Sequence, residues 1–240
     1  MNSFNGRTIL VTGAAGGIGG TTVRHLLDAG ATVIAADHPS ADFARVDPRA
    51  TVLTFDLESE HSVRQALTGI DLYGVVNCAG WGGVVAPTLD ADIDVFDRVV
   101  RINTRGALLV IKHAAQEMIR LGRGGSIVNV SSQASLVALT GHVSYAASKS
   151  ALDSITRVSA LELGEHGIRV NGVNPTVVMT PMSASYWGRA DIEGPFLEAM
   201  PLGRWATEDD IAAPITFLLG DGAAMITGVS LPVDGGYTSR

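Results

Sequence analysis

A tyrosine and a lysine lie four positions apart in the stretch SYAASKS, at Tyr145 and Lys149. If a helix begins near Tyr145, this spacing places both side chains on one helix face. A nearby ammonium favours the phenolate, so the pKa of Tyr145 is expected to fall from about 10 toward neutral pH. Such a tyrosine can give a proton to a carbonyl oxygen or take one from an alcohol. The pair alone does not establish a catalytic role, because any amphipathic helix can carry a tyrosine and a lysine at this spacing.

A glycine-rich stretch, VTGAAGGIGG, follows the first apolar run of the chain. Gly13, Gly17 and Gly19 would let the backbone turn tightly and approach a pyrophosphate, whose charge the N–H groups of a helix start favour. The spacing differs from the common G-x-G-x-x-G pattern, so a turn packed closely for steric reasons is the alternative. We interpret the stretch as a phosphate-binding loop.

Two acids close the second and third apolar runs. Asp37 lies where an acid in such folds binds the adenosine ribose hydroxyls and repels a 2′-phosphate. Neither Gly16 nor His38 supplies the fixed positive charge that favours NADP, so we predict NAD, with NADP less favoured. Asp56, with Leu57 beside it, could accept a hydrogen bond from the adenine amino group. The alternatives are a solvated loop acid for Asp37 and a helix-terminal acid for Asp56.

The elements that must position these residues alternate between short apolar runs and segments of helical spacing. The runs cover 8–12, 32–36, 51–55, 72–77, 126–131, 168–174 and part of 228–236, and the helical segments cover 19–30, 59–69, 92–121, 151–167 and 207–220. This alternation predicts an α/β fold, a doubly wound parallel sheet of about seven strands with helices on both faces. Residues 1–240 are expected to form a single Rossmann-type domain.

One segment, from Met179 to Arg204, has no clear pattern. Pro181, Pro195 and Pro201 would break any long helix there. We interpret this segment as a lid or a pocket wall.

Composition excludes several classes of partner. The chain has 240 residues, a net charge of −7 and one cysteine, Cys78. An acidic protein is unsuited to nucleic acid, and no apolar stretch has the length of a membrane helix or signal segment. A lone cysteine cannot form an internal disulfide, and the six histidines show no paired ligand spacing. We expect a cytoplasmic protein with neither nucleic-acid, membrane nor metal partners.

Five short motifs occur in order along the chain: TGAAGGIG from Thr12, NCAG from Asn77, RINTRG with Asn103, VNVSSQ with Ser132, and YAASK from Tyr145. In order and spacing they resemble the motifs of the short-chain dehydrogenase/reductase family. The resemblance extends from about Gly6 to the terminal ITGVSLPVDGGY, which is nearly the whole chain.

The resemblance implies four catalytic residues. Ser132 would hydrogen-bond the substrate oxygen, and Tyr145 would exchange a proton with it. Lys149 would hold the nicotinamide ribose and depress the tyrosine pKa, and Asn103 would position a water of a proton relay. Hydride transfer belongs to the cofactor. The predicted cofactor residues are Gly13, Gly17, Ile18, Gly19, Asp37, Asp56, Leu57, Asn77, Ala79, Gly80, Tyr145, Lys149, Pro175, Val178 and Thr180.

Residues 126–182 are similar to the L-xylulose reductase, or dicarbonyl reductase, branch of that family, down to NPTVVMT with Thr176 where most members have glycine. This implies a substrate pocket of Ser132, Gln133, Leu139, His142, Tyr145 and Trp187. Its amide, imidazole and indole groups suit a small polyol and ketose, or a vicinal diol and dicarbonyl. That branch uses NADPH through basic residues that this chain replaces with Gly16 and Asp37, so the cofactor preference is expected to be switched.

Two alternative functions share these motifs. A 3-oxoacyl thioester reductase would use the same catalytic residues, but an acyl carrier needs a basic landing surface, and only Arg189 and Arg204 flank the predicted pocket. A non-catalytic nucleotide sensor typically loses the tyrosine or the lysine, both of which are present here. The family commonly forms tetramers, and the apolar segments 106–119 and 151–163 offer surface for it, so we predict a homotetramer.

Overall fold

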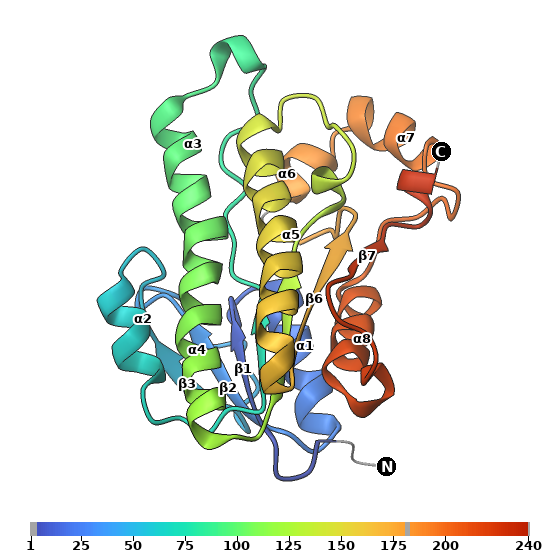
Figure 1. Ribbon diagram of the computed structural model, residues 1–240. Coiled ribbons are helices and arrows are strands. Elements are labelled where there is room, and N and C mark those ends of the chain that lie inside the picture. The colour runs from blue at the N-terminus through green and yellow to red at the C-terminus, as the bar shows by residue number, and fades with distance from the viewer. Residues whose placement is uncertain (1–3, 181–182, 240) are drawn as a thin grey trace.

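Seven parallel strands form one sheet in the computed structural model, which describes residues 4–180 and 183–239. The strand order is β3-β2-β1-β4-β5-β6-β7, which confirms the predicted doubly wound fold (Figure 1). The strands are β1 Thr8–Thr12, β2 Thr32–Asp37, β3 Thr51–Thr54, β4 Gly74–Asn77, β5 Gly125–Val130, β6 Ile168–Pro175 and β7 Ser230–Val233.

Helices cover both faces of the sheet. They are α1 Gly17–Asp28, α2 Glu60–Leu67, α3 Ile93–Val100, α4 Ala107–Leu121, α5 Val143–Leu163, α6 Ala184–Trp187, α7 Ala190–Glu198 and α8 Glu208–Leu219. Helices α4 and α5 stand in front of the sheet in Figure 1, while α1 and α8 pack together behind it. In the part of the chain that the structure describes, no helix is long and apolar enough to cross a bilayer.

The strands are apolar on both sides because two separate cores flank the sheet. Successive side chains of a strand point to opposite faces. In β1, Ile9 and Val11 belong to the core under α1 and α8, and Leu10 belongs to the core under α2, α4 and α5. β5 repeats the pattern, with Val128 on the first face and Ile127 on the second. This is why the sequence shows continuous apolar runs.

The predicted helix over 92–121 is one rod with an irregular middle. Figure 1 shows α3 continuing into α4, and residues Arg101–Gly106 between them form a π-helical segment. The wider turns of a π segment shift the side chains that follow it, and such segments are frequent at functional sites. Asn103 lies within this segment and is buried.

The segment expected to be irregular contains two short helices, α6 and α7. Pro195 lies inside α7, so it does not end the helix, although it removes one backbone donor from it. Trp187, at the end of α6, packs edge-on against Phe196 of α7, with 4.8 Å between the ring centroids. Aromatic packing therefore orders a segment whose backbone pattern gives little indication of structure.

Candidate active site

A cleft of about 1230 Å³ lies at the carboxyl edge of the sheet. The strand order reverses between β1 and β4, and in doubly wound sheets ligands bind in the crevice at this point. The cleft is lined by these predicted residues: Gly13, Gly17, Ile18, Gly19, Asp37, Asp56, Leu57, Ala79, Gly80, Ser132, Gln133, Leu139, His142, Tyr145, Lys149, Pro175, Val178, Thr180 and Trp187. The structure thus brings together all predicted residues except Asn77 and Asn103, which lie behind its wall.

The glycine loop meets the loop after β4 backbone to backbone. The Thr12 hydroxyl accepts hydrogen bonds from the N–H groups of Cys78 and Ala79, each at 3.2 Å. Gly13 has φ +68°, and a Cβ there would lie 2.7 Å from the backbone N and Cα of Ala79. Glycine is therefore required at this position both for its conformation and for the close approach.

The start of α1 is open to an anion. Its N-cap, Gly16, makes no side-chain capping bond, and the described first turn of α1 holds no acidic side chain. A helix N-terminus in this state attracts phosphate through its N–H groups and dipole. The residues present therefore fit the pyrophosphate of a dinucleotide, which Gly17 and Ile18 would hold.

The two predicted adenosine-side acids flank this loop. Asp37 accepts hydrogen bonds from the N–H groups of Ala15 at 3.0 Å and His38 at 2.8 Å. Each carboxylate oxygen keeps a further lone pair for a ribose hydroxyl. Asp56 accepts from the N–H of Glu58 at 2.8 Å, which fixes the turn that starts the next segment.

Tyr145, Lys149 and Ser132 meet at the floor of the cleft. Helix α5 begins at Val143, so Tyr145 and Lys149 share a helix face as the spacing predicts. Ser132 lies near enough to the Tyr145 hydroxyl to lower the pKa of that hydroxyl through hydrogen bonding. The Lys149 ammonium lies 5.6 Å from the centre of the Tyr145 ring and donates to the carbonyl of Val130 at 2.8 Å.

The pKa of Tyr145 shifts in the direction opposite to the sequence-based expectation. Burial raises the pKa of Tyr145, and the hydrogen bond from Ser132 offsets this only in part. Burial likewise lowers the pKa of Lys149 to about 8, from a usual value of 10.5. Removing water penalises the charged form of either group, and the sequence does not show how deeply the pair is enclosed.

Asn103 holds the wall of the cleft rather than lining it. Its amide oxygen accepts from the N–H of Trp81 at 2.7 Å, and its amide nitrogen donates to the Trp81 carbonyl at 2.9 Å and the Ser148 hydroxyl at 3.0 Å. A Cβ on Gly80 would lie 3.3 Å from the Asn103 oxygen and 3.4 Å from the Lys149 nitrogen, so Gly80 passes between them. The water relay implied for Asn103 stays a prediction.

Asn77 lies below the cleft, although it was predicted as a cofactor residue. Its amide nitrogen donates to the side-chain oxygen of Asn129 at 2.8 Å, and Asn129 donates in turn to the Thr156 hydroxyl at 2.8 Å. This buried chain of polar groups joins β4, β5 and α5. It fixes the strand end from which the loop through Ala79 departs.

Sequence reasoning missed a buried carboxylate that supports Ser132. The side chain of Asp153 accepts from the Ser135 hydroxyl at 2.6 Å and the Asn174 amide at 2.9 Å. The same two groups lie against the Ser132 carbonyl, at 2.6 and 3.2 Å. A signal was available, because Asp153 follows Lys149 by four positions and so lies on the same buried helix face.

The substrate side of the cleft contains an unpartnered amide. Gln133 is 1% exposed, and neither of its amide atoms has a hydrogen-bond partner among the described residues. Nearby, the His142 ring stacks on Trp187 at 5.4 Å between centroids. His142 Nδ1 lies 2.8 Å from the Thr140 carbonyl, which can only accept, so Nδ1 is the nitrogen that carries a proton in the neutral ring.

One further residue of the cleft, Trp81, was not singled out from the sequence. Trp81 follows the NCAG motif and lines the cleft, with the Arg98 guanidinium 5.0 Å from its ring centre. Cys78 lies in the same wall, and burial raises the pKa of its thiol to about 12. The thiol therefore stays protonated at neutral pH, as expected for a packing residue.

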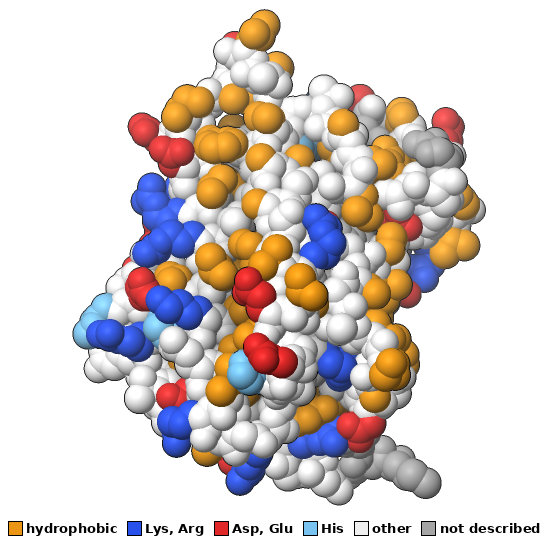
Figure 2. All heavy atoms as spheres, viewed as in Figure 1, with side chains coloured by type: hydrophobic (Ala, Val, Ile, Leu, Met, Phe, Trp, Pro, Cys, Tyr) orange, Lys and Arg blue, Asp and Glu red, His pale blue; other side chains and the backbone are white. Residues whose placement is uncertain are grey.

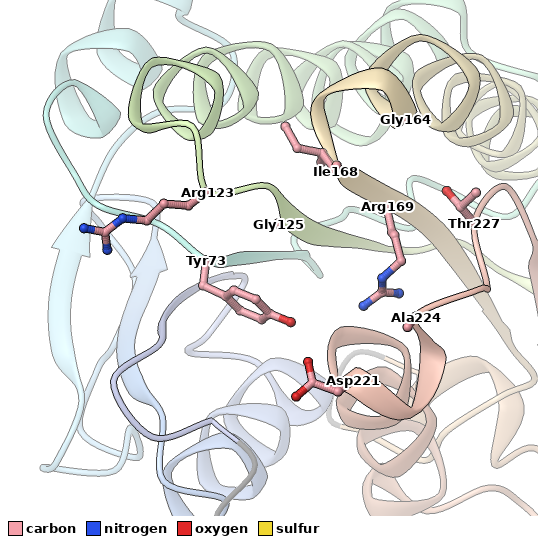
Figure 3. Close-up of a pocket in the computed structure, with 10 residues that line it drawn as sticks. Tyr73, Arg123, Gly125, Gly164, Ile168, Arg169, Asp221, Ala224 and Thr227 are labelled. Carbon is pink, nitrogen blue, oxygen red and sulfur yellow. The ribbon is translucent and has the colours of Figure 1, made fainter.

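A second cavity, of about 400 Å³, opens at the opposite edge of the sheet (Figure 3). Its polar groups are bonded within the protein. Arg169 donates to the carbonyls of Leu218 and Leu219 at the end of α8, and Tyr73 donates to the Leu219 carbonyl at 3.0 Å. Asp221 forms an ion pair with Arg7 at 2.9 Å. These contacts satisfy the carbonyl groups at the end of α8, so the residues around this cavity stabilise the fold.

Comparison with known proteins gives a consistent picture. The family model described as enoyl-(acyl carrier protein) reductase matches residues 13–238. The chain is 40% identical to L-xylulose reductase from Bos taurus over 235 residues, 97% of this chain and 96% of the relative. It is similar to the solved structure of a short-chain type dehydrogenase/reductase from Mycobacterium ulcerans, with a TM-score of 0.94, 33% identity, and coverage of 99% and 92% of the two chains.

A third similar protein is informative about the cofactor. A structure from Agrobacterium tumefaciens, assigned as a 2-deoxy-D-gluconate 3-dehydrogenase, contains bound NADP. It matches with a TM-score of 0.93 and 29% identity, and the match covers 100% of this chain and 99% of that one. The shared nucleotide-binding fold thus implies a nicotinamide cofactor.

Proposed function

The chain belongs to the short-chain dehydrogenase/reductase family, and on this basis we propose that it interconverts a small polyol and a ketose, or a vicinal diol and a dicarbonyl, with NAD(H). It is an enzyme acting on CH–OH groups. The substrate class rests on one observation, the enclosed and unpartnered amide of Gln133 next to Ser132. A buried amide without partners is costly, and a substrate with a hydroxyl or second carbonyl beside the reacting carbon would satisfy it.

The proposed chemistry divides between cofactor and chain. When bound, the nicotinamide supplies or accepts the hydride. Ser132 hydrogen-bonds the substrate oxygen and Tyr145 Oη moves the proton to or from it. Both side chains line the same cleft, and the Ser132 hydroxyl lowers the pKa of Tyr145. Asp153, through Ser135 and Asn174, fixes the backbone of Ser132.

We propose NAD rather than NADP because of the charge at the end of β2. Asp37 lies on the cleft beside Gly16 and His38, and a carboxylate there repels a 2′-phosphate. The NADP in the Agrobacterium protein belongs to a chain only 29% identical to this one. Asp37→Asn keeps an acceptor for the Ala15 N–H while removing the charge. It should improve NADPH binding relative to NADH about tenfold, and Asp42→Asn, an exposed acid on the following loop, should not. An unchanged ratio in Asp37→Asn would contradict the assignment.

The alternative of an acyl carrier substrate is disfavoured by charge. Arg189 pairs with Asp191 at 2.6 Å, and Arg204 pairs with Asp210 at 2.6 Å. The two cations expected to flank the pocket are thus already neutralised. An acidic carrier protein would have little free positive charge to bind.

The decisive experiment follows the absorbance of the reduced nicotinamide. NAD is paired with pentitols, hexitols and vicinal diols, and NADH with xylulose, diacetyl and an acetoacetyl thioester. We expect turnover of the polyol or ketose. Preference for the thioester would move the function to acyl reduction, and no turnover of any carbonyl would favour a nucleotide sensor.

The amide itself is tested by Gln133→Leu. We expect kcat/KM for xylulose or diacetyl to fall about tenfold or more, because the partner of the second oxygen is lost. A monofunctional ketone such as cyclohexanone, which has no second oxygen, serves as the matched control and should be reduced at least as well. An equal loss of kcat/KM on both ketones would show that the amide does not bind the second oxygen of the substrate.

We propose that the enzyme is a homotetramer. The outward faces of α4 and α5 carry exposed apolar side chains, among them Val158 at 53% and Leu161 at 83% exposure. Figure 2 shows apolar side chains gathered over these helices. Such a patch supports burial against another copy. Light scattering of the wild type and of Leu161→Glu tests this, and a monomeric wild type would refute it.

A further inference from the structure

Glu208, the first residue of α8, lies against the phosphate-binding end of α1. Its Oε2 accepts a hydrogen bond from the Thr21 hydroxyl at 2.8 Å. A Cβ added to Gly17 would clash with its Oε1 and would lie 2.9 Å from the methyl group of Thr180. The carboxylate is therefore packed beside two residues that line the cleft and that we assign to the cofactor.

The carboxylate of Glu208 makes no direct ion pair among the described residues, and the Arg24 guanidinium reaches it only through the Thr21 hydroxyl. Of the next two acids of the same turn, Asp209 hydrogen-bonds the His25 ring at 2.7 Å and Asp210 forms an ion pair with Arg204 at 2.6 Å. The nearest guanidinium on α1, that of Arg24, binds the Thr21 hydroxyl at 2.7 Å instead. Glu208 is half-buried, so water screens its charge only in part.

We propose that Glu208 sets the cofactor affinity by placing a negative charge beside the pyrophosphate site. In the protein without cofactor, the carboxylate provides the negative charge that the start of α1 lacks. A bound pyrophosphate would take over that role and would be repelled by Glu208. Both effects weaken binding of the dinucleotide and hasten its release. This inference rests on the proposed use of a nicotinamide dinucleotide.

The test compares two variants that remove one charge each. Glu208→Gln keeps an acceptor for the Thr21 hydroxyl, and Asp209→Asn removes the neighbouring charge, which faces His25. Fluorescence titration measures the Kd of NADH, and competition measures that of ADP-ribose and of adenosine, which has no phosphate. We expect Glu208→Gln to bind NADH and ADP-ribose about three- to tenfold more tightly, with adenosine unchanged. Asp209→Asn should change each Kd by less than about twofold.

The salt dependence gives a second readout. The difference between the wild type and Glu208→Gln should shrink as ionic strength rises, because salt screens the repulsion. Equal or weaker NADH binding by Glu208→Gln would overturn the proposal, as would tighter adenosine binding. If the wild type bound neither NADH nor NADPH, the cofactor assignment would fail and this proposal with it. A substrate panel without turnover, by contrast, would leave the binding result intact.

Discussion

The buried ammonium of Lys149 should make the protein more stable as the pH rises above neutrality. Burial lowers the pKa of Lys149 to about 8, from 10.5 in the unfolded chain. Between these values the unfolded state binds more protons than the folded state, so the free energy of unfolding increases with pH. For a single group with this shift, the increase from pH 7 to pH 9.5 is about 2 kcal/mol, and it is complete only above 10.5.

Two measurements check this value. The chain has only two lysines, Lys112 and Lys149, so ¹³C NMR of protein labelled at lysine Cε shows two side-chain signals, and Lys112→Arg assigns them. Urea unfolding of the wild type and of Lys149→Met at pH 7 and 9.5 gives the free energy of unfolding of each protein. The difference between the two proteins removes the contributions of all other titrating groups. We expect that difference to change by about 2 kcal/mol in favour of the wild type. A constant difference, or a Lys149 signal that titrates only near 10.5, would refute the reasoning.

Three further outcomes are expected. Tyr145→Phe should lower kcat at least about a thousandfold and leave the Kd of NADH within about twofold, measured by absorbance and fluorescence; substantial residual turnover would remove Tyr145 from proton transfer. Gly13→Ala should lower the free energy of unfolding, measured by urea titration, by about 2–4 kcal/mol, because its Cβ meets the backbone of Ala79. Gly69→Ala, also at positive φ but with open space around it, is the control and should lose less stability. Trp187→Ala should raise the KM of the ketose more than the Kd of NADH, since Trp187 stacks on His142, and an unchanged substrate profile would exclude it from the pocket.

The strands and the long helices could be predicted because their apolar periods reflect simple burial. A parallel strand covered on both faces reads as a continuous apolar run, as in β1, β4, β5 and β6, whereas the edge strands β3 and β7 are more exposed. The π-helical segment around Asn103 could not be predicted, because one extra residue in a helical turn leaves no compositional trace. The helix containing Pro195 was missed for a related reason. Its order comes from aromatic contacts, including the stacking of Phe196 on Tyr237, which is distant in sequence, at 4.7 Å between ring centroids.

Most of the candidate site could be predicted because loops after parallel strands meet at one edge. Residues from six such loops line the cleft as the motifs indicate. What the sequence could not show is enclosure. Asp153 and Glu208 carry no motif, and their positions depend on how α5 and α8 pack against the sheet and α1. Burial also raises the pKa of Tyr145, where the sequence had predicted a lowered pKa.

The raised pKa of Tyr145 affects which direction of the reaction the protein favours at neutral pH. Burial raises the pKa of Tyr145, so the side chain is a phenol near neutral pH. Burial lowers the pKa of Lys149 only to about 8, so the lysine is still mainly an ammonium at neutral pH. In this state Tyr145 can give a proton to a ketone, and the free protein is ready for reduction. Oxidation of an alcohol requires Tyr145 to be a phenolate first, and because burial raises the pKa of Tyr145, this form becomes available only as the pH rises through the alkaline range. The oxidative direction should therefore gain with pH through this range while the reductive direction declines, whichever direction the cell's cofactor ratio imposes.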